Sequence, residues 1–406
     1  MSDKNMTMKA LIDQAEKDLL HTYNRYQVVL DHGEGVYLYD TEGKKYLDFM
    51  SGIGVFALGY NNEYYNKALE QQIGKILHTS NYFYNVPAIT AAHRLKEISG
   101  MDRVFFANSG AEAVEGALKA AIKYAYNKDG ASDHQVVALE HSFHGRTVGS
   151  LSVTGTDEYR APFYPLMSGV AFADFNDLSS VEEAVTDRTC AIIFEPLQGE
   201  GGIHPATKEF MEGVRKLCDE KGILLIFDEI QCGLGRTGSF YTFQQYGVRP
   251  DILTTAKALG GGLPVGAFVV TNDVAENSLK PGDHGSTYGG NPLCTRAVAE
   301  SLKLLKERNL PGHVKELAPC FEASLEKLTQ KFSFVKEHRG MGYMQGLELA
   351  PSVKAIDVVK KALSKGLILL TAEGNVVRML PPLIAEKEDF DRMEEILAEV
   401  MGDFAE

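Results

Sequence analysis

The sequence predicts an α/β protein built around a mostly parallel central sheet with helices on both faces. Short apolar runs recur up to about residue 270 and are separated mostly by helical patterns, as expected of strands that are buried on both faces. Most of these runs end in a polar residue. In open α/β sheets the ligand binds at the carboxyl ends of the strands, so these polar residues are candidates for a site.

The expected strands, in chain order, are RVFFA from 103, HQVVALE from 134, CAIIFE from 190, GILLIFD from 222, DILTTA from 251 and GAFVV from 266. The polar residues at or just after their ends are Asn108, Ser109, Glu140, Glu195, Asp228 and Lys257. Beyond Pro292, long amphipathic segments such as RAVAESLKLLKER alternate with strand-like pieces such as NVVRML, which is typical of a smaller α+β domain. We therefore expect an N-terminal segment of residues 1–50 joining the small domain, a large domain of residues 51–290 and a C-terminal small domain of residues 291–406.

Composition narrows the classes of function. A chain of 406 residues is long enough for two domains, and its formal charge of −14 argues against nucleic-acid or anionic-membrane partners and leaves small molecules. The five cysteines are scattered without a CxxC spacing, which fits a reducing compartment and predicts no metal site. The N-terminus lacks a signal-type apolar region and no apolar run reaches the ~20 residues of a membrane span, so we expect a cytoplasmic protein.

Lys257 is the one charged residue between Asp251 and Asp273. It is either a strand-end lysine whose amine reaches water or a desolvated amine used in chemistry. Ser109 and Glu112 in ANSGAEAVEGALKAA make an S-x-x-E capping box, and the same helix start, with Gly110, would bind a phosphate through free N–H groups. The cap and the phosphate site are compatible.

GLGRTG at 233–238 fits the G-x-G-x-x-G pattern of dinucleotide enzymes, which makes an oxidoreductase a rival interpretation. The context is unfavourable, because EIQC separates the strand from the first glycine and no long helix pattern opens there. A non-catalytic binding protein is a second rival, but it leaves Lys257 without a purpose.

One cofactor would account for the helix start at Ser109, the aromatic residue in HSFHGRT, Asp228 and Lys257 together. Pyridoxal phosphate needs a phosphate cradle, an aromatic ring on its face, a carboxylate at its pyridine nitrogen and a lysine for a Schiff base. The helix start at Ser109, the aromatic in HSFHGRT, Asp228 and Lys257 supply these four in turn.

FDEIQCGLGRTG followed by KALGGGLPVGA is a specific signature, and the chain resembles the class III, fold type I aminotransferases along almost its whole length. The resemblance implies that Lys257 is catalytic, bonding to the cofactor and then moving the proton. It further implies that Asp228 holds the pyridine nitrogen, Gln231 the ring hydroxyl and Phe143 the ring face. The phosphate would be bound by Ser109, Gly110 and Ala111, with Thr287 and the neighbouring Ser286 reaching across the interface of a homodimer with shared active sites.

The same resemblance implies the substrates. Arg146 and Arg378 look like the family's two carboxylate binders, and Glu200 like the acid that pairs with Arg378; a surface salt bridge is the alternative for that pair. The resemblance is greatest to the acetylornithine branch, which implies arginine biosynthesis, with transfer from N2-acetyl-L-ornithine to 2-oxoglutarate. Ornithine, succinylornithine and 4-aminobutyrate enzymes and class III aminomutases share the same cofactor residues and remain alternatives.

Three positions depart from the family pattern. Acetylornithine enzymes usually read GIAVNALGH where this chain has GIGVFALGY, so Phe56 and Tyr60 replace an asparagine and a histidine. Val114 replaces a common asparagine. We expect Phe56 to lie near the substrate entrance and to make that entrance apolar.

Overall fold

The computed structural model describes residues 6–405 and is organised around a seven-stranded sheet. Its order is β4-β12-β11-β10-β7-β5-β6, and β12 runs antiparallel to both neighbours while the other adjacent strands are parallel. The strands are β4 (Arg103–Ala107), β5 (Gln135–Leu139), β6 (Val170–Ala173), β7 (Thr189–Phe194), β10 (Leu224–Asp228), β11 (Ile252–Thr255) and β12 (Gly266–Val270). All six expected strands are present, and the prediction of a mostly parallel sheet is confirmed; β6 was not among them.

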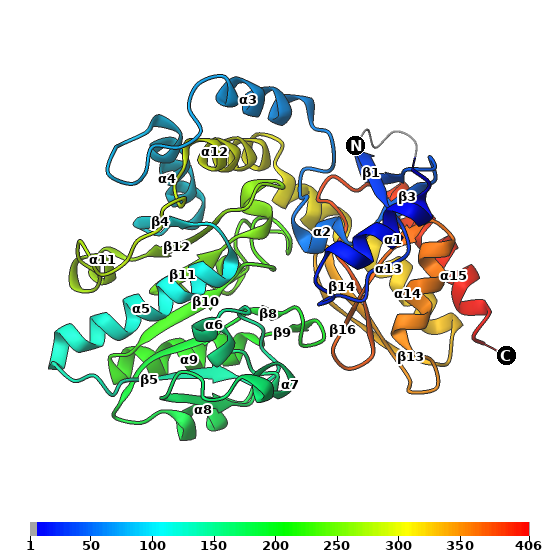
Figure 1. Cartoon of the computed structure of the whole chain (residues 1–406). Coiled ribbons are helices and arrows are strands. Elements are labelled where there is room, and N and C mark those ends of the chain that lie inside the picture. The colour runs from blue at the N-terminus through cyan, green and yellow to red at the C-terminus, as the bar shows by residue number, and fades with distance from the viewer. Residues whose placement is uncertain (1–5, 406) are drawn as a thin grey trace.

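Two hydrophobic cores lie on opposite faces of this sheet. Successive strand residues alternate between them, with Ile192 and Phe227 in one core and Ile193 and Ile226 in the other. Helix α5 (Gly110–Asp129) contributes to the second core, whereas α9 (Lys208–Lys221) and α12 (Pro292–Glu307) contribute to the first. The alternation follows from the two-residue period of a strand, and it confirms the expected helices on both faces (Figure 1).

The C-terminal part carries a second sheet of order β13-β14-β17-β16, which is antiparallel throughout. Its strands are β13 (Val335–Met341), β14 (Met344–Leu349), β16 (Leu370–Ala372) and β17 (Val376–Met379), with helices α13 (Leu310–Lys331), α14 (Ala355–Ser364) and α15 (Lys387–Gly402) beside them. In Figure 1 these elements lie apart from the seven-stranded sheet, next to the N-terminal strands.

The N-terminal strands pair with a strand from the far end of the chain. β1 (Leu30–Glu34), β2 (Tyr37–Asp40) and β3 (Lys45–Asp48) form antiparallel pairs, and β3 then pairs in parallel with β15 (Leu367–Ile368). Helix α12 packs on α3 (Glu63–Ile73) and α4 (Val86–Ser99). The domain boundaries after residues 50 and 290 remain a prediction.

Short elements complete the described chain: α1 (Met8–Asp18), α2 (Ser51–Gly54), α6 (Val148–Ser152), α7 (Asp157–Arg160), η2 (Ala161–Phe163), α8 (Leu178–Ala184), β8 (Leu197–Gln198), β9 (His204–Pro205), α10 (Phe243–Tyr246), η3 (Lys257–Gly260) and α11 (Asn272–Asn277). Across residues 6–405 no helix is both long and apolar enough to cross a membrane. The same residues contain no group of three or more His, Cys, Asp or Glu side chains placed to hold a metal ion.

Candidate active site

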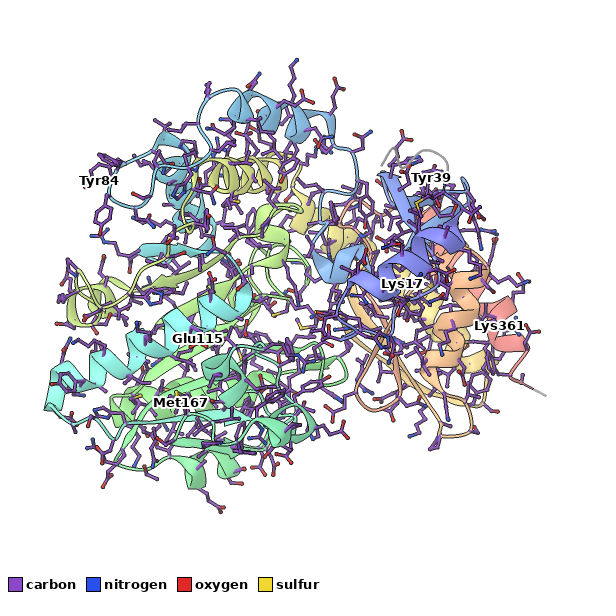
Figure 2. The ribbon with its side chains drawn as sticks, in the orientation of Figure 1. Lys17, Tyr39, Tyr84, Glu115, Met167 and Lys361 are labelled. Carbon is purple, nitrogen blue, oxygen red and sulfur yellow. The ribbon has the colours of Figure 1, made fainter. Side chains whose placement is uncertain are left out.

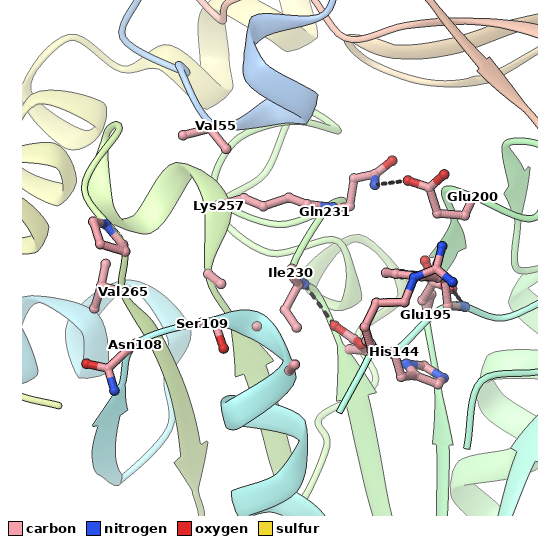
Figure 3. A pocket seen from close by; sticks show the side chains of 18 of the residues that line it. Val55, Asn108, Ser109, His144, Glu195, Glu200, Ile230, Gln231, Lys257 and Val265 are labelled. Atoms are coloured by element: carbon pink, nitrogen blue, oxygen red, sulfur yellow. Dashed lines mark hydrogen bonds and ion pairs between the residues drawn. The ribbon is translucent and has the colours of Figure 1, made fainter. Parts of the chain in front are cut away.

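A cavity of about 460 Å³ opens at the carboxyl ends of the strands of the central sheet (Figure 3). It gathers side chains that follow β4, β5, β7, β10 and β11, as the strand-end rule predicts. Nine of the twelve predicted site residues line it: Ser109, Gly110, Ala111, Phe143, Arg146, Glu200, Asp228, Gln231 and Lys257. Among the strand-end candidates, Asn108 and Glu195 also line it, whereas Glu140 faces a separate hollow beside His141.

Lys257 lies two residues beyond the end of β11 and begins η3. Its φ of +43° is a left-handed conformation that a residue with a side chain rarely adopts, and such strain is concentrated at functional sites. Burial lowers the pKa of the Lys257 amine, and nearby Glu200 opposes that effect. Of the two interpretations of this lysine, the structure therefore supports the desolvated amine, whose neutral form becomes accessible at lower pH than that of an exposed lysine.

The helix α5 begins at the floor of the cavity. Its N-cap Ser109 accepts a hydrogen bond from Glu112 N (3.2 Å), while the Glu112 carboxylate accepts one from Asn108 N (2.7 Å), one residue earlier than a standard capping box. Among the described residues, no acceptor meets the backbone N–H of Gly110 or Ala111. These two free donors at a helix N-terminus face the cavity and suit an anion.

Packing around Gly110 is close. A Cβ there would lie 2.9 Å from the end of the Ile230 side chain, which lines the same cavity and would have to shift. Gly266 at the start of β12 is more tightly constrained, since its Cβ would lie 2.1 Å from the backbone carbonyl oxygen of Ser109. The antiparallel strand β12 thus presses its first residue against the N-terminus of α5.

Asp228 ends β10 with both carboxylate oxygens hydrogen-bonded. Oδ1 accepts from Ile230 N (3.1 Å) and from Thr254 Oγ1 (3.0 Å), and Oδ2 lies 2.7 Å from His144 Nδ1. Both Asp228 and His144 are buried. The sequence analysis missed His144, although the residue stands in the HSFHGRT motif next to Phe143; no spacing pattern signalled its pairing with a residue so far along the chain.

Glu195 is a second buried carboxylate in the cavity wall whose role the sequence did not show. Oε1 accepts from Phe143 N (3.0 Å) and Oε2 from Gly199 N (3.0 Å), so the side chain links the loop that carries Phe143 to the loop that carries Glu200. Burial raises the pKa of Glu195 to about 7, and the two backbone donors only partly offset this.

Arg378 on β17 belongs to the second sheet and binds Glu200, which lines the cavity, with two nitrogens of its guanidinium. The two N···O distances are 2.7 and 3.1 Å, and Gln231 Oε1 accepts a third hydrogen bond at 3.0 Å. Arg378 is 3% exposed. Although burial opposes it, Arg378 holds the pKa of Glu200 below its ordinary value. A bidentate pair with a buried guanidinium and a half-buried carboxylate differs from the alternative of an ordinary surface salt bridge.

Arg146 belongs to the more open part of the cavity and is exposed. Its guanidinium carbon lies 3.8 Å from the centre of the Tyr159 ring and 5.3 Å from that of Phe143. Stacking on these rings keeps the cation oriented while its N–H groups remain available to a ligand.

Three predicted residues do not line the cavity. Arg378 acts at one remove through Glu200 and Gln231, as described above. Ser286 Oγ accepts a hydrogen bond from Asn108 Nδ2 (3.0 Å), and Thr287 is exposed on the next position of that segment.

Phe56 was expected near the substrate entrance, and its ring lies next to the cavity wall without lining it. The cavity is lined by Val55, whereas the Phe56 ring packs behind Gly262. Tyr60 donates a hydrogen bond to Asp48, and Val114 is fully buried in α5. The strand and helix periods of the sequence do not reveal this arrangement, because α2 has a left-handed backbone.

The geometry also decides against the dinucleotide rival. Residues 233–238 form turns that no long helix follows, and Arg236 points into the interior, where its guanidinium donates to the carbonyl oxygens of Tyr343 (3.3 Å) and Pro381. The glycines of this segment lie in turns around Arg236, whose buried side chain connects the segment to Tyr343 and Pro381 in the C-terminal part of the chain. They do not form a phosphate-binding loop.

The cavity fits pyridoxal phosphate. Two unpaired N–H groups suit its phosphate, the Asp228 carboxylate suits its pyridine nitrogen, and the Phe143 ring and the Lys257 amine line the space between. No pattern of metal ligands competes for the same residues in the part of the chain that the structure describes.

Comparisons with known proteins agree with this chemistry. Residues 20–401 match the family model described as aminotransferase class-III. The acetylornithine aminotransferase of Methanocaldococcus jannaschii is 47% identical over 395 residues, covering 97% of this chain and 98% of that protein. The ornithine aminotransferase of Toxoplasma gondii, a structure with partial occupancy of PLP at its active site, has a TM-score of 0.94 at 32% identity and covers 98% of this chain and 96% of its own. The acetylornithine aminotransferase of Elizabethkingia anophelis has a TM-score of 0.87 at 30% identity, with coverage of 98% and 100%.

Proposed function

The chain belongs to the class III aminotransferases, and on that premise we propose that it transfers the terminal amino group of N2-acetyl-L-ornithine to 2-oxoglutarate. The products are N-acetylglutamate 5-semialdehyde and glutamate, a step of arginine biosynthesis. The names of the relatives at 45–47% identity support this donor. The fold alone does not, because ornithine and acetylornithine enzymes both superpose closely.

The observation that carries the proposal is the bidentate pair of buried Arg378 and half-buried Glu200 near Lys257. The enzyme has to accept glutamate, which brings two carboxylates, and also a donor whose reacting end is a bare amine. With the donor bound, Glu200 neutralises Arg378, which would otherwise be a desolvated and unpaired charge. With glutamate bound, the α-carboxylate takes the guanidinium instead.

The enzyme depends on pyridoxal phosphate, which when bound supplies a carbonyl carbon for the amine and a ring that accepts electrons. We assign the phosphate to Ser109 and to the N–H groups of Gly110 and Ala111. Asp228 would keep a negative charge at the ring nitrogen, stabilised by the donors from Ile230, Thr254 and His144. Phe143 would cover one face of the ring, and Gln231 would bind the ring hydroxyl.

Lys257 Nζ is the group that we assign to covalent attachment and proton movement. Its lowered pKa makes the neutral amine, which is the form that attacks and accepts a proton, easier to reach near neutral pH. Arg146 would fix the carboxylate at the far end of the donor, so that the terminal amine is the group delivered to Lys257. The same arginine would bind the distal carboxylate of 2-oxoglutarate.

We also propose a homodimer in which Ser286 and Thr287 reach the active site of the second copy. Tyr82, Phe83 and Tyr84 are exposed, and Figure 2 shows Tyr84 projecting from the edge of the molecule. Asn81 Nδ2 donates to the carbonyl oxygens of Ser286 (3.1 Å) and Gly289 (2.8 Å), so this aromatic loop and the Thr287 segment form one surface. Such a patch supports association, which sedimentation of the purified protein would test.

A donor panel tests the function. Acetylornithine, succinylornithine, ornithine and 4-aminobutyrate are assayed side by side with 2-oxoglutarate. We expect the acetylated donor to give the highest kcat/KM, since free ornithine brings a second ammonium that the apolar wall would have to desolvate. A clear preference for ornithine or 4-aminobutyrate would overturn the donor and leave the transaminase intact.

A further inference from the structure

The segment that forms the upper wall of the cavity has an unusual backbone. Ser51, Gly52, Ile53 and Gly54 have φ values of +44°, +64°, +65° and +77°, so four consecutive residues make one left-handed turn. Glycine adopts this conformation readily, but serine and β-branched isoleucine do not, so the surroundings have to impose it. The next residue, Val55, lines the cavity, and Figure 3 places it close to Lys257.

Asp48 holds the start of this left-handed turn. It is fully buried, and its Oδ1 accepts hydrogen bonds from Met50 N (2.8 Å) and Ser51 N (3.0 Å). Its Oδ2 accepts one from the Tyr60 hydroxyl (2.6 Å), and Ser51 Oγ donates to Leu380 O (2.6 Å). Since a buried carboxylate depends on its donors, the Tyr60 hydroxyl is part of what keeps Asp48 able to fix the turn.

Phe56 supports the same turn from its other side. A Cβ on Gly52 would lie 3.3 Å from the Phe56 ring, and one on Gly262, which lines the cavity, would lie 3.0 Å from it. The rings of Phe56 and Tyr60 lie 4.4 Å apart between centres, and Tyr60 in turn covers Gly33 so closely that a Cβ there would be 2.5 Å from its ring. The two aromatic side chains therefore form a single packed unit behind the cavity wall.

We propose that Phe56 and Tyr60 act together as positioning residues, fixing the left-handed turn so that Val55 and Gly262 shape a wall selective for a donor with an uncharged α-nitrogen. Neither side chain lines the cavity, so both act through the wall. They are also the two neighbouring positions at which this chain departs from the asparagine and histidine usual in acetylornithine enzymes. The inference deepens the proposed function and rests on it for the identity of the donor.

A double-mutant cycle tests the coupling. Phe56→Asn, Tyr60→His and the double variant are compared with wild type as cofactor-loaded enzymes, with single-turnover rates measured separately for acetylornithine, ornithine and glutamate. We expect each single change to lower kcat/KM for acetylornithine by roughly tenfold and to leave the glutamate rate within about twofold. The double variant should lose less than the product of the two single losses, because either single change already breaks the contact between the two rings. Independent, multiplying losses would overturn the proposal, as would equal losses with all three substrates.

A milder pair of variants covers the case in which Tyr60→His does not fold. Tyr60→Phe keeps the ring contact with Phe56 and removes only the hydrogen bond to Asp48; we expect roughly a fivefold loss of the rate with acetylornithine. Tyr124→Phe is the matched control, since the Tyr124 hydroxyl likewise donates to an aspartate, Asp273 (2.7 Å), and neither residue lines the cavity. A wild-type donor rate in Tyr60→Phe, or the same loss in both variants, would refute the role of Tyr60.

The mutant tests of Phe56 and Tyr60 and the donor panel can fail independently of each other. If wild type prefers ornithine or 4-aminobutyrate, the proposed donor is wrong, and the cycle is then run with the preferred amine. Coupling between Phe56 and Tyr60 with that amine would still establish the positioning role, and its absence would overturn it.

Discussion

The two sides of the cavity are built differently. The cofactor side, formed by Ser109, Gly110, Asp228 and Lys257, comes from strand ends of one sheet, and both oxygens of its carboxylate are held by fixed donors. The donor side, formed by Arg146, Glu200 and Arg378, draws on two sheets; Arg146 is open to solvent, and the Glu200 side chain is 26% exposed.

This difference separates the side of the cavity that serves the chemistry from the side that serves substrate specificity. A rigid sheet preorganises the groups that every transamination needs, so little reorganisation is required when charge moves. The donor side has to satisfy two unlike substrates in turn, and an ion pair that opens and closes is suited to that task. Four substitutions and one matched control can break or sharpen this contrast.

Lys257→Ala should have the largest effect. Loss of the amine removes both covalent attachment and proton movement, so turnover should fall by about 10⁴-fold. Borohydride reduction followed by mass spectrometry should find the cofactor bonded to Lys257 in wild type and no bonded cofactor in the variant. The affinity for 2-oxoglutarate should change little, because the donor side is intact; an active variant would contradict the assignment of Lys257.

Asp228→Asn removes a charge from the cofactor side at nearly constant shape. Preorganised electrostatic partners commonly account for 10² to 10³ in rate, so we expect a loss of that order in both half-reactions, measured by single turnover. Thermal unfolding should confirm that the fold survives. Near-normal turnover would show that Asp228 does not serve the ring nitrogen.

Glu195→Gln tests whether ionisation of the buried Glu195 carboxylate destabilises the cofactor-free protein. The folded-state pKa of about 7 lies above the ordinary 4.5, so the contribution of Glu195 to stability is complete below pH 4.5 and is lost as the pH rises through 7. Between pH 5 and 7, wild type should lose about 2 kcal/mol of its free energy of unfolding through Glu195, and the variant should not show this loss. The free energy of unfolding measured across that range checks it.

Glu229→Gln is the matched control. Burial also raises the pKa of Glu229 to about 7, and its carboxylate also accepts from two backbone N–H groups, those of Thr242 and Phe243, yet it does not line the cavity. Both variants should flatten the dependence of stability on pH. Only Glu195→Gln should also weaken cofactor binding, since Glu195 holds the loop of Phe143; equal cofactor affinity in the two variants would contradict that role.

Glu200→Ala should have the smallest effect and act on one half-reaction. It frees Arg378, so the reaction with acetylornithine should slow on the order of tenfold while the reaction with glutamate is unchanged or faster. Stopped-flow measurement of each half separates the two. Equal losses in both halves would mean that the pair is only structural.

The sequence predicted the cofactor side better than the donor side, for physical reasons. Strand ends and helix caps have local signatures, so Ser109, Asp228 and Lys257 could be placed from their neighbours. The partners that brace them come from distant segments. His144 has no local pattern that pairs it with Asp228, and the strand-end position of Glu195 did not reveal its hydrogen bond to Phe143 N.

On the donor side, the position of Phe56 depended on a left-handed turn that no residue period encodes, so the wall at Val55 was missed. The antiparallel direction of β12 was also absent from the prediction, because an apolar run reads alike in either direction. The roles of Ser286 and Thr287, across an interface, still rest on the family resemblance.

The pairing of β3 with β15 has a consequence for the growing chain. Residues 45–48 leave the ribosome early, whereas residues 367 and 368, which complete their sheet, are made near the end of synthesis. Until then β3 exposes an unpaired edge next to the buried residues Tyr46 and Leu47, a surface prone to association with other chains. A nascent chain stopped before residue 367 should therefore bind chaperones through this strand, and release from them should coincide with the synthesis of β15.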